Sequence, residues 1–173
     1  MNIVGDHLAD VARRSKASDK IGFDLFGRSA YNRYYYSVFL HVRMVLMTID
    51  SRWAPPYKLA HNSVPGLFRG RVLTKLTKQL EVAQKSGQIT PDEAKQMFSW
   101  AHTAAEELAM LLDSAREVRT VADYHPETAV TREGAVIKLS DCKLDTAKNW
   151  KRRAETLAKT ILYIYGQLDR ISS

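Results

Sequence analysis

The stretch Thr90-Pro91-Asp92-Glu93-Ala94 opens the longest helical pattern of the chain and decides its fold class. Thr90 is a suitable N-cap, Pro91 fits the first turn, and Glu93 can complete a capping box. Small or apolar residues then recur at the period of one helix face. They are Ala94, Met97, Ala101, Ala104, Leu108, Leu111, Ala115 and Val118. The pattern predicts one long helix that presents a heptad-like seam to its neighbours.

Four other stretches carry the same helical period. The last runs from about Asp141 to Ile171, and earlier ones cover about Ile3 to Lys16, Phe23 to Asp50, and Val64 or Pro65 to Lys85. Trp53-Ala54-Pro55-Pro56 is expected to end the second of these helices. Long straight helices with such seams favour nearly antiparallel packing. The sequence therefore predicts an all-α fold, an antiparallel bundle of four to five helices.

One short region departs from the helical period. Alternating apolar residues in Ala135–Leu139, next to Gly134, predict a small hairpin or extended loop near residues 126–140. The chain of 173 residues has no internal repeat, low-complexity tract or linker. We therefore expect a single domain over residues 1–173.

Charge and cysteine content narrow the class of partner and compartment. The net charge of +7 favours polyanionic partners such as nucleic acid. Cys142 is the only cysteine, which excludes an internal disulfide and a cysteine-based metal site. The most apolar window, residues 34–49, is interrupted by His41 and Arg43 and is too short to cross a bilayer. We expect a cytoplasmic protein with no membrane partner.

The candidate chemistry lies at the end of the longest helical pattern, in Arg116-Glu117-Val118-Arg119-Thr120-Val121-Ala122-Asp123-Tyr124-His125-Pro126. Pro126 disfavours the helical conformation of the residue before it, so His125 is expected to leave the helix and turn back towards Arg119. A permanent cation beside an imidazole suits chemistry on a phosphodiester.

The spacing of this arginine and histidine carries little weight alone. The chain has 14 arginines and 5 histidines, so one pair at such a spacing is expected by chance. The alternative interpretation is that Arg119 forms an ion pair with Glu117 or Asp123 while His125 ends a loop.

Four segments together resemble the HEPN family (higher eukaryotes and prokaryotes nucleotide-binding domains). Residues 29–41, with Tyr-Tyr-Tyr before Phe-Leu-His, resemble its tyrosine-rich helix, and His61-Asn62-Ser63-Val64-Pro65 resembles its turn after that helix. Residues 119–124 are similar to its Arg-x-x-Ala-Asp-Tyr element. Arg119 and His125 match the arginine, four to six residues, histidine signature of its ribonucleases. The final helix stands where the last helix of the family belongs, so the resemblance spans roughly residues 20–171.

This resemblance implies a helical homodimer that cleaves single-stranded RNA without a metal or other cofactor, at a cleft shared by two subunits. The catalytic roles then fall on Arg119 and His125. The residues implied to contact RNA are Arg116, Thr120, Asp123 and Tyr124. By family habit, the protein would be a toxin or antiphage-defence effector restrained by an antitoxin or nucleotidyltransferase-like partner.

The chain departs from the family pattern at two positions. Active members usually carry Asn, Asp or His after the arginine, where this chain has Thr120. Toxins silenced by nucleotidyltransferases carry a tyrosine two places after the histidine, where this chain has Glu127. Two alternatives to a ribonuclease stay open: a catalytically silent nucleotide- or RNA-binding module that docks an effector, and a helical scaffold whose arginine and histidine only stabilise the dimer.

Other polar and aromatic residues have structural interpretations that we favour. The cluster Tyr31, Tyr34, Tyr35 and Tyr36 is expected to pack in the core rather than stack on bases. Arg28 and Arg33 are each expected to form a structural ion pair rather than bind phosphate. The basic strip, defined as Lys148, Lys151, Arg152 and Arg153, is expected to be a solvated face, with steering of RNA as the alternative.

Overall fold

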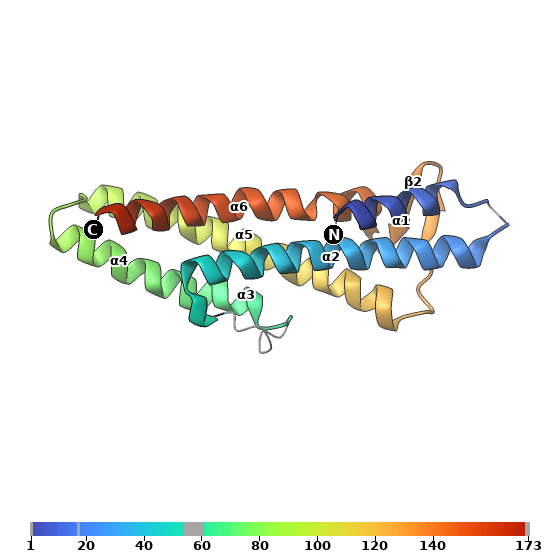
Figure 1. The fold of residues 1–173 in the computed structure, drawn as a ribbon, viewed down its shortest axis with the longest axis horizontal. Helices are drawn as coiled ribbons and strands as arrows, with labels where there is room; N and C mark the ends of the chain where they lie inside the picture. Colours follow the sequence, from blue (N-terminus) through green and yellow to red (C-terminus); the bar gives the residue numbers. More distant parts are fainter. Residues whose placement is uncertain (1, 17, 54–60, 172–173) are drawn as a thin grey trace. The chain divides into compact units, whose positions relative to one another are not determined.

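The computed structural model describes residues 2–16, 18–53 and 61–171. This part of the chain is mostly helical, and it contains five helices of 13 residues or more (Figure 1). These are α1 (Asn2–Arg14), α2 (Lys20–Ile49), α4 (Leu73–Lys85), α5 (Pro91–Tyr124) and α6 (Leu144–Ile171). The predicted helical class is confirmed. The residues Ala54, Pro55 and Pro56, expected to end the second helix, lie outside the described residues.

Two predicted helix boundaries reflect local chemistry. The capping box at the start of α5 forms as expected: the Glu93 backbone N–H donates to Thr90 Oγ1 (3.2 Å), and the Thr90 backbone N–H donates to Glu93 Oε2 (2.7 Å). These contacts lower the pKa of Glu93, because the Thr90 N–H and hydroxyl donate to its carboxylate. After α2, a 3-10 turn, η1 (Ser51–Trp53), closes the described segment.

The predicted helix from Val64 or Pro65 to Lys85 contains an irregular turn. Its first part is the short α3 (Val64–Leu67), followed by the π-helical turn η2 (Phe68–Val72) and then by α4. Single π turns inside helices change the direction of side chains and free backbone groups. Here the Val72 carbonyl accepts a hydrogen bond from the Tyr165 hydroxyl at 2.6 Å.

The predicted hairpin is present and gains a third strand. The strands β1 (Thr131–Glu133), β2 (Val136–Leu139) and β3 (Cys142–Lys143) form an antiparallel sheet in the order β1-β2-β3. Gly134, with φ of 60°, makes the first turn, and Ser140, with φ of 51°, lies in the second. A left-handed φ suits glycine and costs a serine some strain.

The chain divides into two compact units. Unit 1 comprises Met1–Leu40 and Asp113–Arg153, and unit 2 comprises His41–Leu112 and Ala154–Ser173. Helices α2, α5 and α6 each contribute one part to each unit. The expectation of one domain over residues 1–173 stays a prediction.

Unit 1 packs around three tyrosines of α2. Tyr31, Tyr34 and Tyr35 are at most 1% exposed, which confirms core packing for these three members of the tyrosine cluster. Tyr36, the fourth member, is half-buried. The Tyr31 hydroxyl donates to the Cys142 carbonyl at 2.6 Å. This contact fixes the edge strand β3 against the helix. Burial raises the pKa of the Cys142 thiol to about 11.

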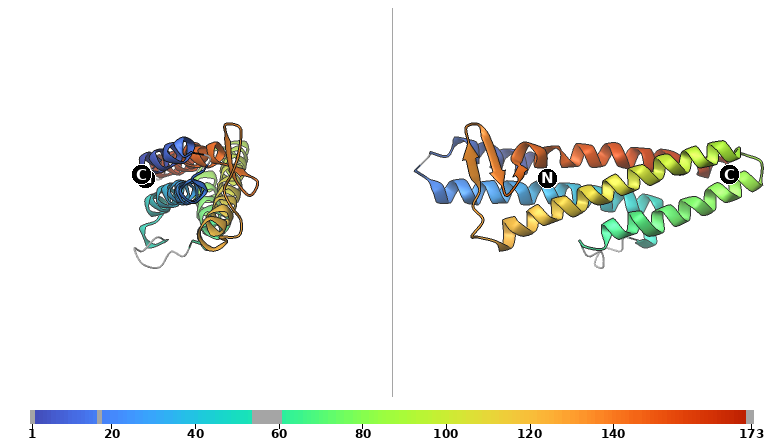
Figure 2. Two further views of the ribbon diagram at one scale, coloured as in Figure 1. Left: turned by 90° about the vertical axis from the view of Figure 1, so that its right-hand side faces the viewer. Right: turned by 180° about the vertical axis from the view of Figure 1, so that it is seen from behind.

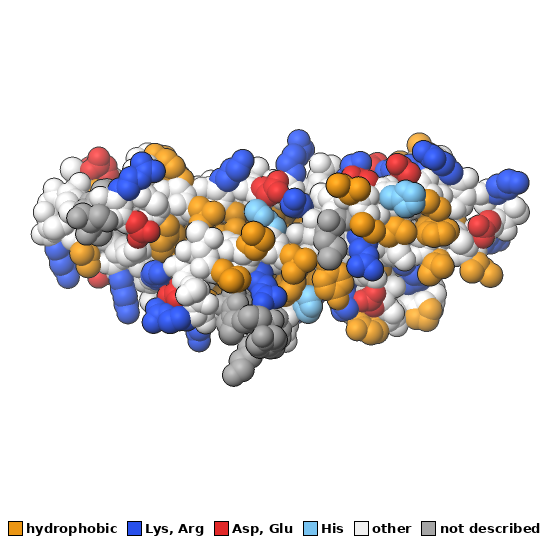
Figure 3. Space-filling model, viewed as in Figure 1, with side chains coloured by type: hydrophobic (Ala, Val, Ile, Leu, Met, Phe, Trp, Pro, Cys, Tyr) orange, Lys and Arg blue, Asp and Glu red, His pale blue; other side chains and the backbone are white. Residues whose placement is uncertain are grey.

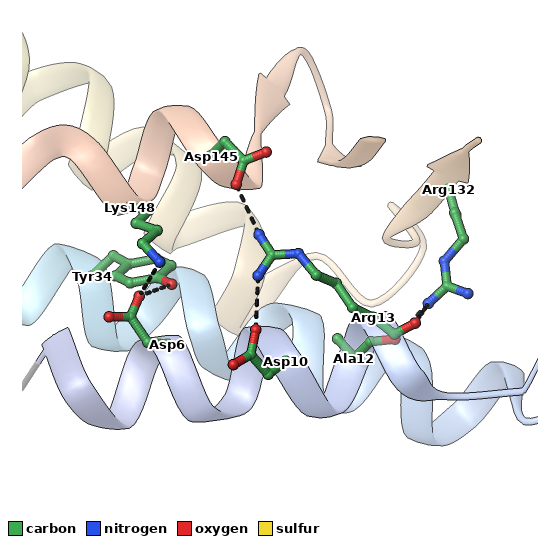
Figure 4. A network of polar contacts seen from close by, with 8 residues as sticks. All are labelled: Asp6, Asp10, Ala12, Arg13, Tyr34, Arg132, Asp145 and Lys148. Carbon is green, nitrogen blue, oxygen red and sulfur yellow. Dashed lines mark hydrogen bonds and ion pairs between the residues drawn. The ribbon is translucent and has the colours of Figure 1, made fainter. Parts of the chain in front are cut away.

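A polar network fastens α1 to the rest of unit 1 (Figure 4). Asp6 accepts a hydrogen bond from the Tyr34 hydroxyl (2.8 Å) and pairs with Lys148 (3.1 Å). Arg13 bridges Asp10 on its own helix (3.0 Å) and Asp145 at the start of α6 (2.8 Å). Lys148 of the basic strip therefore neutralises a carboxylate instead of standing free.

The sheet lies across the first half of α2 in this unit (Figure 2). A Cβ at Gly27 would meet the Val130 side chain at 2.9 Å, so this glycine permits the close approach of the segment before β1. Arg132 of β1 donates to the Ala12 carbonyl at the end of α1 (2.5 Å). The segment between α5 and α6 is thereby fixed to α1 and to α2.

Unit 2 has an aliphatic and aromatic core supplied by all of its helices. Its fully buried large side chains, at less than 2% exposure, are Leu46, Phe68, Leu76, Leu108, Ile161, Ile164 and Leu168. Lys75 of α4 donates to the Ile49 carbonyl at the end of α2 (2.6 Å), a cationic cap on carbonyls that the helix leaves without an internal partner. None of the described helices combines the length and the apolar character that crossing a membrane requires.

Candidate functional site

A polar stripe on α2 faces the C-terminal part of α5 within unit 1. The polar stripe consists of Asp24, Arg28, Asn32 and Tyr36, each four residues after the last. Residues four apart lie on nearly the same side of a helix. Every member contacts α5 or the segment that follows it, so α2 is the frame on which both predicted catalytic residues are held.

Arg28 caps the end of α5. Its Nη1 donates to the carbonyls of Val121, Ala122 and His125, each at 3.2 Å. Its Nη2 donates to the Thr128 carbonyl at 2.5 Å. The last carbonyls of a helix have no partner inside the helix, and a guanidinium at this end also favours the helix dipole. Arg28 therefore fixes the exit path of the chain after α5.

Asp24 completes this cap. Its Oδ2 accepts from Arg28 Nε at 2.6 Å, and its Oδ1 accepts from the Val130 backbone N–H at 2.7 Å. The ion pair predicted for Arg28 is confirmed. The one predicted for Arg33 does not form among the described residues, because this side chain is exposed on the same helix. The Arg28 side chain is only 12% exposed, so it is not a ready phosphate ligand.

Arg119 is held in a pocket of aromatic rings and one carboxylate. Its Nε lies 2.7 Å from Asp123 Oδ2, and its Nη2 donates to the Tyr36 hydroxyl at 3.3 Å. Its guanidinium carbon lies 5.3 Å from the centre of the Tyr124 ring and 5.8 Å from that of Tyr36. Burial acts to lower the pKa of Arg119, and Asp123 and Tyr36 outweigh it, so the net shift is upward.

Asp123 links Arg119 to the polar stripe. Its Oδ1 accepts a hydrogen bond from the Asn32 amide, while its other oxygen faces the arginine. The carboxylate therefore orients the guanidinium and also neutralises it. The ion pair with Asp123 is the one anticipated by the non-catalytic interpretation of the motif, although Arg119 is 19% exposed rather than on the open surface.

His125 leaves the helix as predicted, but its ring faces Glu127 and not Arg119 as expected. Helix α5 ends at Tyr124, and the His125 backbone N–H still reaches the Val121 carbonyl at 3.2 Å. The ring Nδ1 lies 2.8 Å from Glu127 Oε1, and the side chain is 49% exposed. No described contact joins His125 to Arg119. The His125 ring pairs with Glu127, and the Arg119 guanidinium pairs with Asp123.

The His125–Glu127 pair has a chemical consequence. When Nδ1 carries the proton, it donates to the carboxylate and leaves Nε2 with a lone pair. The pKa of Glu127 is lowered by its own backbone N–H and by the histidine ring, so the carboxylate stays charged. A carboxylate that fixes the tautomer of an exposed imidazole is the arrangement of a general base.

The other residues expected to contact RNA lie on the same part of α5. Tyr124 is 65% exposed and offers one ring face to solvent beside Arg119. Thr120 is half-buried on the helix. Arg116 pairs with Asp113 at 3.6 Å, one turn before Arg119.

Sequence reasoning missed Asp24 and Asn32 as supports of the site. The signal was present as a repeat of polar residues every four positions in a helix that is otherwise rich in aromatic and aliphatic residues. Which helix end this stripe faces depends on tertiary packing. In the described part of the chain, no group of three histidine, cysteine or acidic residues is placed to hold a metal ion.

Comparisons with known proteins identify no relative of this chain. No protein-family model, curated protein or solved structure matches the chain.

Proposed function

We propose that unit 1 carries a metal-independent endoribonuclease site of the HEPN type, with Arg119 and His125 as its catalytic residues. The observation that supports this most is the exposed His125 ring with Glu127 at its Nδ1, which leaves the other ring nitrogen available to a substrate. The net charge of +7 favours attraction of a polyanion. The proposal rests on this chemistry and on the resemblance of residues 119–125 to the family signature.

In the proposed reaction, His125 removes the proton of a ribose 2′-hydroxyl. The 2′-oxygen attacks the adjacent phosphorus, the bond to the 5′-oxygen of the next nucleotide breaks, and that oxygen takes up a proton. The products are a 2′,3′-cyclic phosphate and a 5′-hydroxyl. Arg119 stabilises the charge that develops on the phosphate oxygens. To do so, its guanidinium exchanges part of its contact with Asp123 for the phosphate.

We further propose that the working site is formed by two copies of the chain. Within one chain, Arg119 and His125 have separate partners. A homodimer would place the residues of one copy beside those of the other, and single-stranded RNA would lie along the seam. A role as a toxin or antiphage effector, restrained by an antitoxin or nucleotidyltransferase-like partner, belongs to the same proposal.

A second candidate is a catalytically silent module that binds RNA or a nucleotide and docks an effector. The ion pair between Arg119 and Asp123 favours it over catalysis, because a guanidinium engaged with its own carboxylate is less free to stabilise the charge that develops on a reacting phosphate. This module would use the same residues for binding and need no proton transfer by His125.

The discriminating experiment incubates the purified protein with single-stranded RNA in the presence of EDTA. We expect cleavage that yields 2′,3′-cyclic phosphate ends and that falls by at least about 100-fold in His125→Ala. Glu127→Gln should retain the fold and lower the rate, since it weakens the orientation of the ring. His7→Ala is the matched control, because His7 is an exposed histidine of the same unit, and it should leave the rate unchanged.

The outcomes separate the candidates. Intact RNA together with saturable binding that weakens in Arg119→Ala would replace the ribonuclease by the silent module. Cleavage that survives in His125→Ala would contradict the assigned role. Sedimentation analysis on the same samples tests the shared site, because activity should follow the dimer fraction as the protein is diluted.

A further inference from the structure

A groove in unit 2 gathers positive charge beside an aromatic ring. It lies between η1 at the end of α2 and the first turns of α4, and its volume is about 680 Å³. This volume is typical of sites that enclose a small organic ligand. Among the described residues that line it, the cations are Arg52, Arg71, Lys75 and Lys78, and the one carboxylate is Asp50. Figure 3 shows Lys and Arg side chains along the α4 part of one face.

The single carboxylate of the groove is already neutralised. Asp50 accepts from Arg52 at Nε (2.8 Å) and Nη2 (2.6 Å), and Lys75 Nζ lies 3.6 Å away. The Arg52 guanidinium holds the pKa of Asp50 well below its ordinary value. Asp50 therefore stays charged and organises two of the cations, and four cations less one carboxylate leave three positive charges in the groove.

The remaining two cations face the groove without a described partner. Arg71 and Lys78 are both exposed, and no ion pair or hydrogen bond to them occurs among the described residues. Arg71, Lys75 and Lys78 follow one another at spacings of four and three, which places them along one side of the helix. Arg71 and Lys78 add positive charge beside Lys75, which an anion in the groove would offset.

The walls of the groove suit more than a bare anion. Trp53 is half-buried in the lining, with Lys75 Nζ 5.5 Å from its ring centre, and Val82, also in the lining, is 59% exposed. Gly70 lies in the π-helical turn, and a Cβ there would meet no atom within 4 Å, so the groove is open at this position. A ligand with a flat apolar part can cover the indole while its anionic part meets the cations.

We propose that this groove binds a small organic phosphate that carries a flat ring. Phosphate matches the charge because two or three cations can share its oxygens, and the ring accounts for Trp53. An inorganic anion would leave the indole and Val82 uncovered. This site is separate from Arg119 and His125, so it stands or falls independently of the ribonuclease proposal.

The test measures binding of phenyl phosphate by calorimetry, beside inorganic phosphate and phenol as its two parts. We expect phenyl phosphate to bind more tightly than either part. Arg71→Ala combined with Lys78→Ala should weaken it by about tenfold or more, from loss of charge-assisted hydrogen bonds. Lys159→Ala, an exposed lysine of unit 2 outside the groove, should bind like the unaltered protein.

A second variant tests the aromatic wall. Trp53→Leu should weaken phenyl phosphate while leaving inorganic phosphate unchanged, and circular dichroism checks that each variant is folded. Absence of saturable binding, or equal binding by the Arg71/Lys78 variant, would overturn the proposal. Tighter binding of a hexanucleotide RNA through the same residues would also overturn it in favour of a nucleic-acid surface. His125→Ala should not alter any of these affinities.

Discussion

At the scale of single residues, Arg28 determines how the chain leaves α5. Its guanidinium donates hydrogen bonds to carbonyls of α5 and of the following loop, and the ion pair with Asp24 fixes its orientation. Removing it would take a charged donor from part-buried carbonyls such as Ala122 and Thr128, and would leave Asp24 with the Val130 N–H. Such losses are larger than those from surface ion pairs, because several hydrogen bonds are lost together and the groups are partly shielded from water.

We predict that Arg28→Ala lowers the free energy of unfolding by about 2–4 kcal/mol, as measured by urea titration. Arg33→Ala is the matched control, since Arg33 is an exposed arginine of the same helix with no described partner. It should change stability by less than about 0.5 kcal/mol. Equal effects of the two substitutions would show that the cap contributes nothing.

The sequence predicted residue roles unevenly. An ion pair for Arg28 was predictable because Asp24 lies one turn earlier on the same helix. The carbonyls that Arg28 also serves lie more than ninety residues away in sequence. The partner of His125 was also not foreseen. Glu127 is close to it in sequence, but the turn that brings the two side chains together is held by Arg28 and Asp24, which are distant in sequence.

At the scale of elements, two helical glycines have opposite surroundings. A Cβ at Gly5 of α1 would lie 2.7 Å from the Tyr34 ring, which is held by its hydrogen bond to Asp6. A Cβ at Gly166 of α6 would meet no atom within 4 Å. Gly5 therefore lets α1 approach α2, whereas Gly166 only weakens the intrinsic helical preference of its segment.

We predict that Gly5→Ala destabilises the protein by about 1–3 kcal/mol, since the tyrosine ring has no room to retreat. Gly166→Ala should stabilise it by about 0.5–1 kcal/mol through helix propensity. Thermal unfolding followed by circular dichroism measures both. A gain in stability in both variants would mean that the contact between α1 and Tyr34 is loose.

Element boundaries were predictable where the cause is local. The capping box of Thr90 and Glu93 fixed the start of α5, and Pro126 fixed the departure of His125 from the helix. The π-helical turn η2 was not predictable, because its altered hydrogen-bonding depends on contacts such as Tyr165 to Val72. Strand β3 was missed because two residues are too few to show an alternating pattern.

At the scale of the whole molecule, connectivity joins the two units. Helices α2, α5 and α6 each contribute residues to both units. If one unit unfolds, each of these helices loses part of its length, and the part in the other unit becomes a shorter helix with a new end. Helix formation is cooperative along the chain. The expected consequence is a single unfolding transition.

Tryptophan positions allow this to be measured. Trp150 is buried in unit 1, whereas Trp53 and Trp100 belong to unit 2. In a Trp53→Phe, Trp100→Phe variant, fluorescence reports unit 1 while far-ultraviolet circular dichroism reports all helices. We predict coincident urea midpoints for the two signals. Separate midpoints would show that the units unfold independently.

The helical class and the region of the site followed from the sequence, whereas the geometry of the site did not. Helical periodicity is a local property, and a match to a short motif depends only on order and spacing. Whether Arg119 and His125 act on one substrate depends on contacts with Tyr36, Asp123 and Glu127, and in our proposal on a second copy. These contacts follow from tertiary packing.

The thiol at the edge strand offers one practical use. Because Cys142 is the chain's sole cysteine and burial raises its pKa to about 11, it remains protonated and slow to alkylate in the native protein. An increase in its rate of labelling over that of the native protein would therefore report detachment of the edge strand β3 from Tyr31, with no engineered probe and no competing thiol.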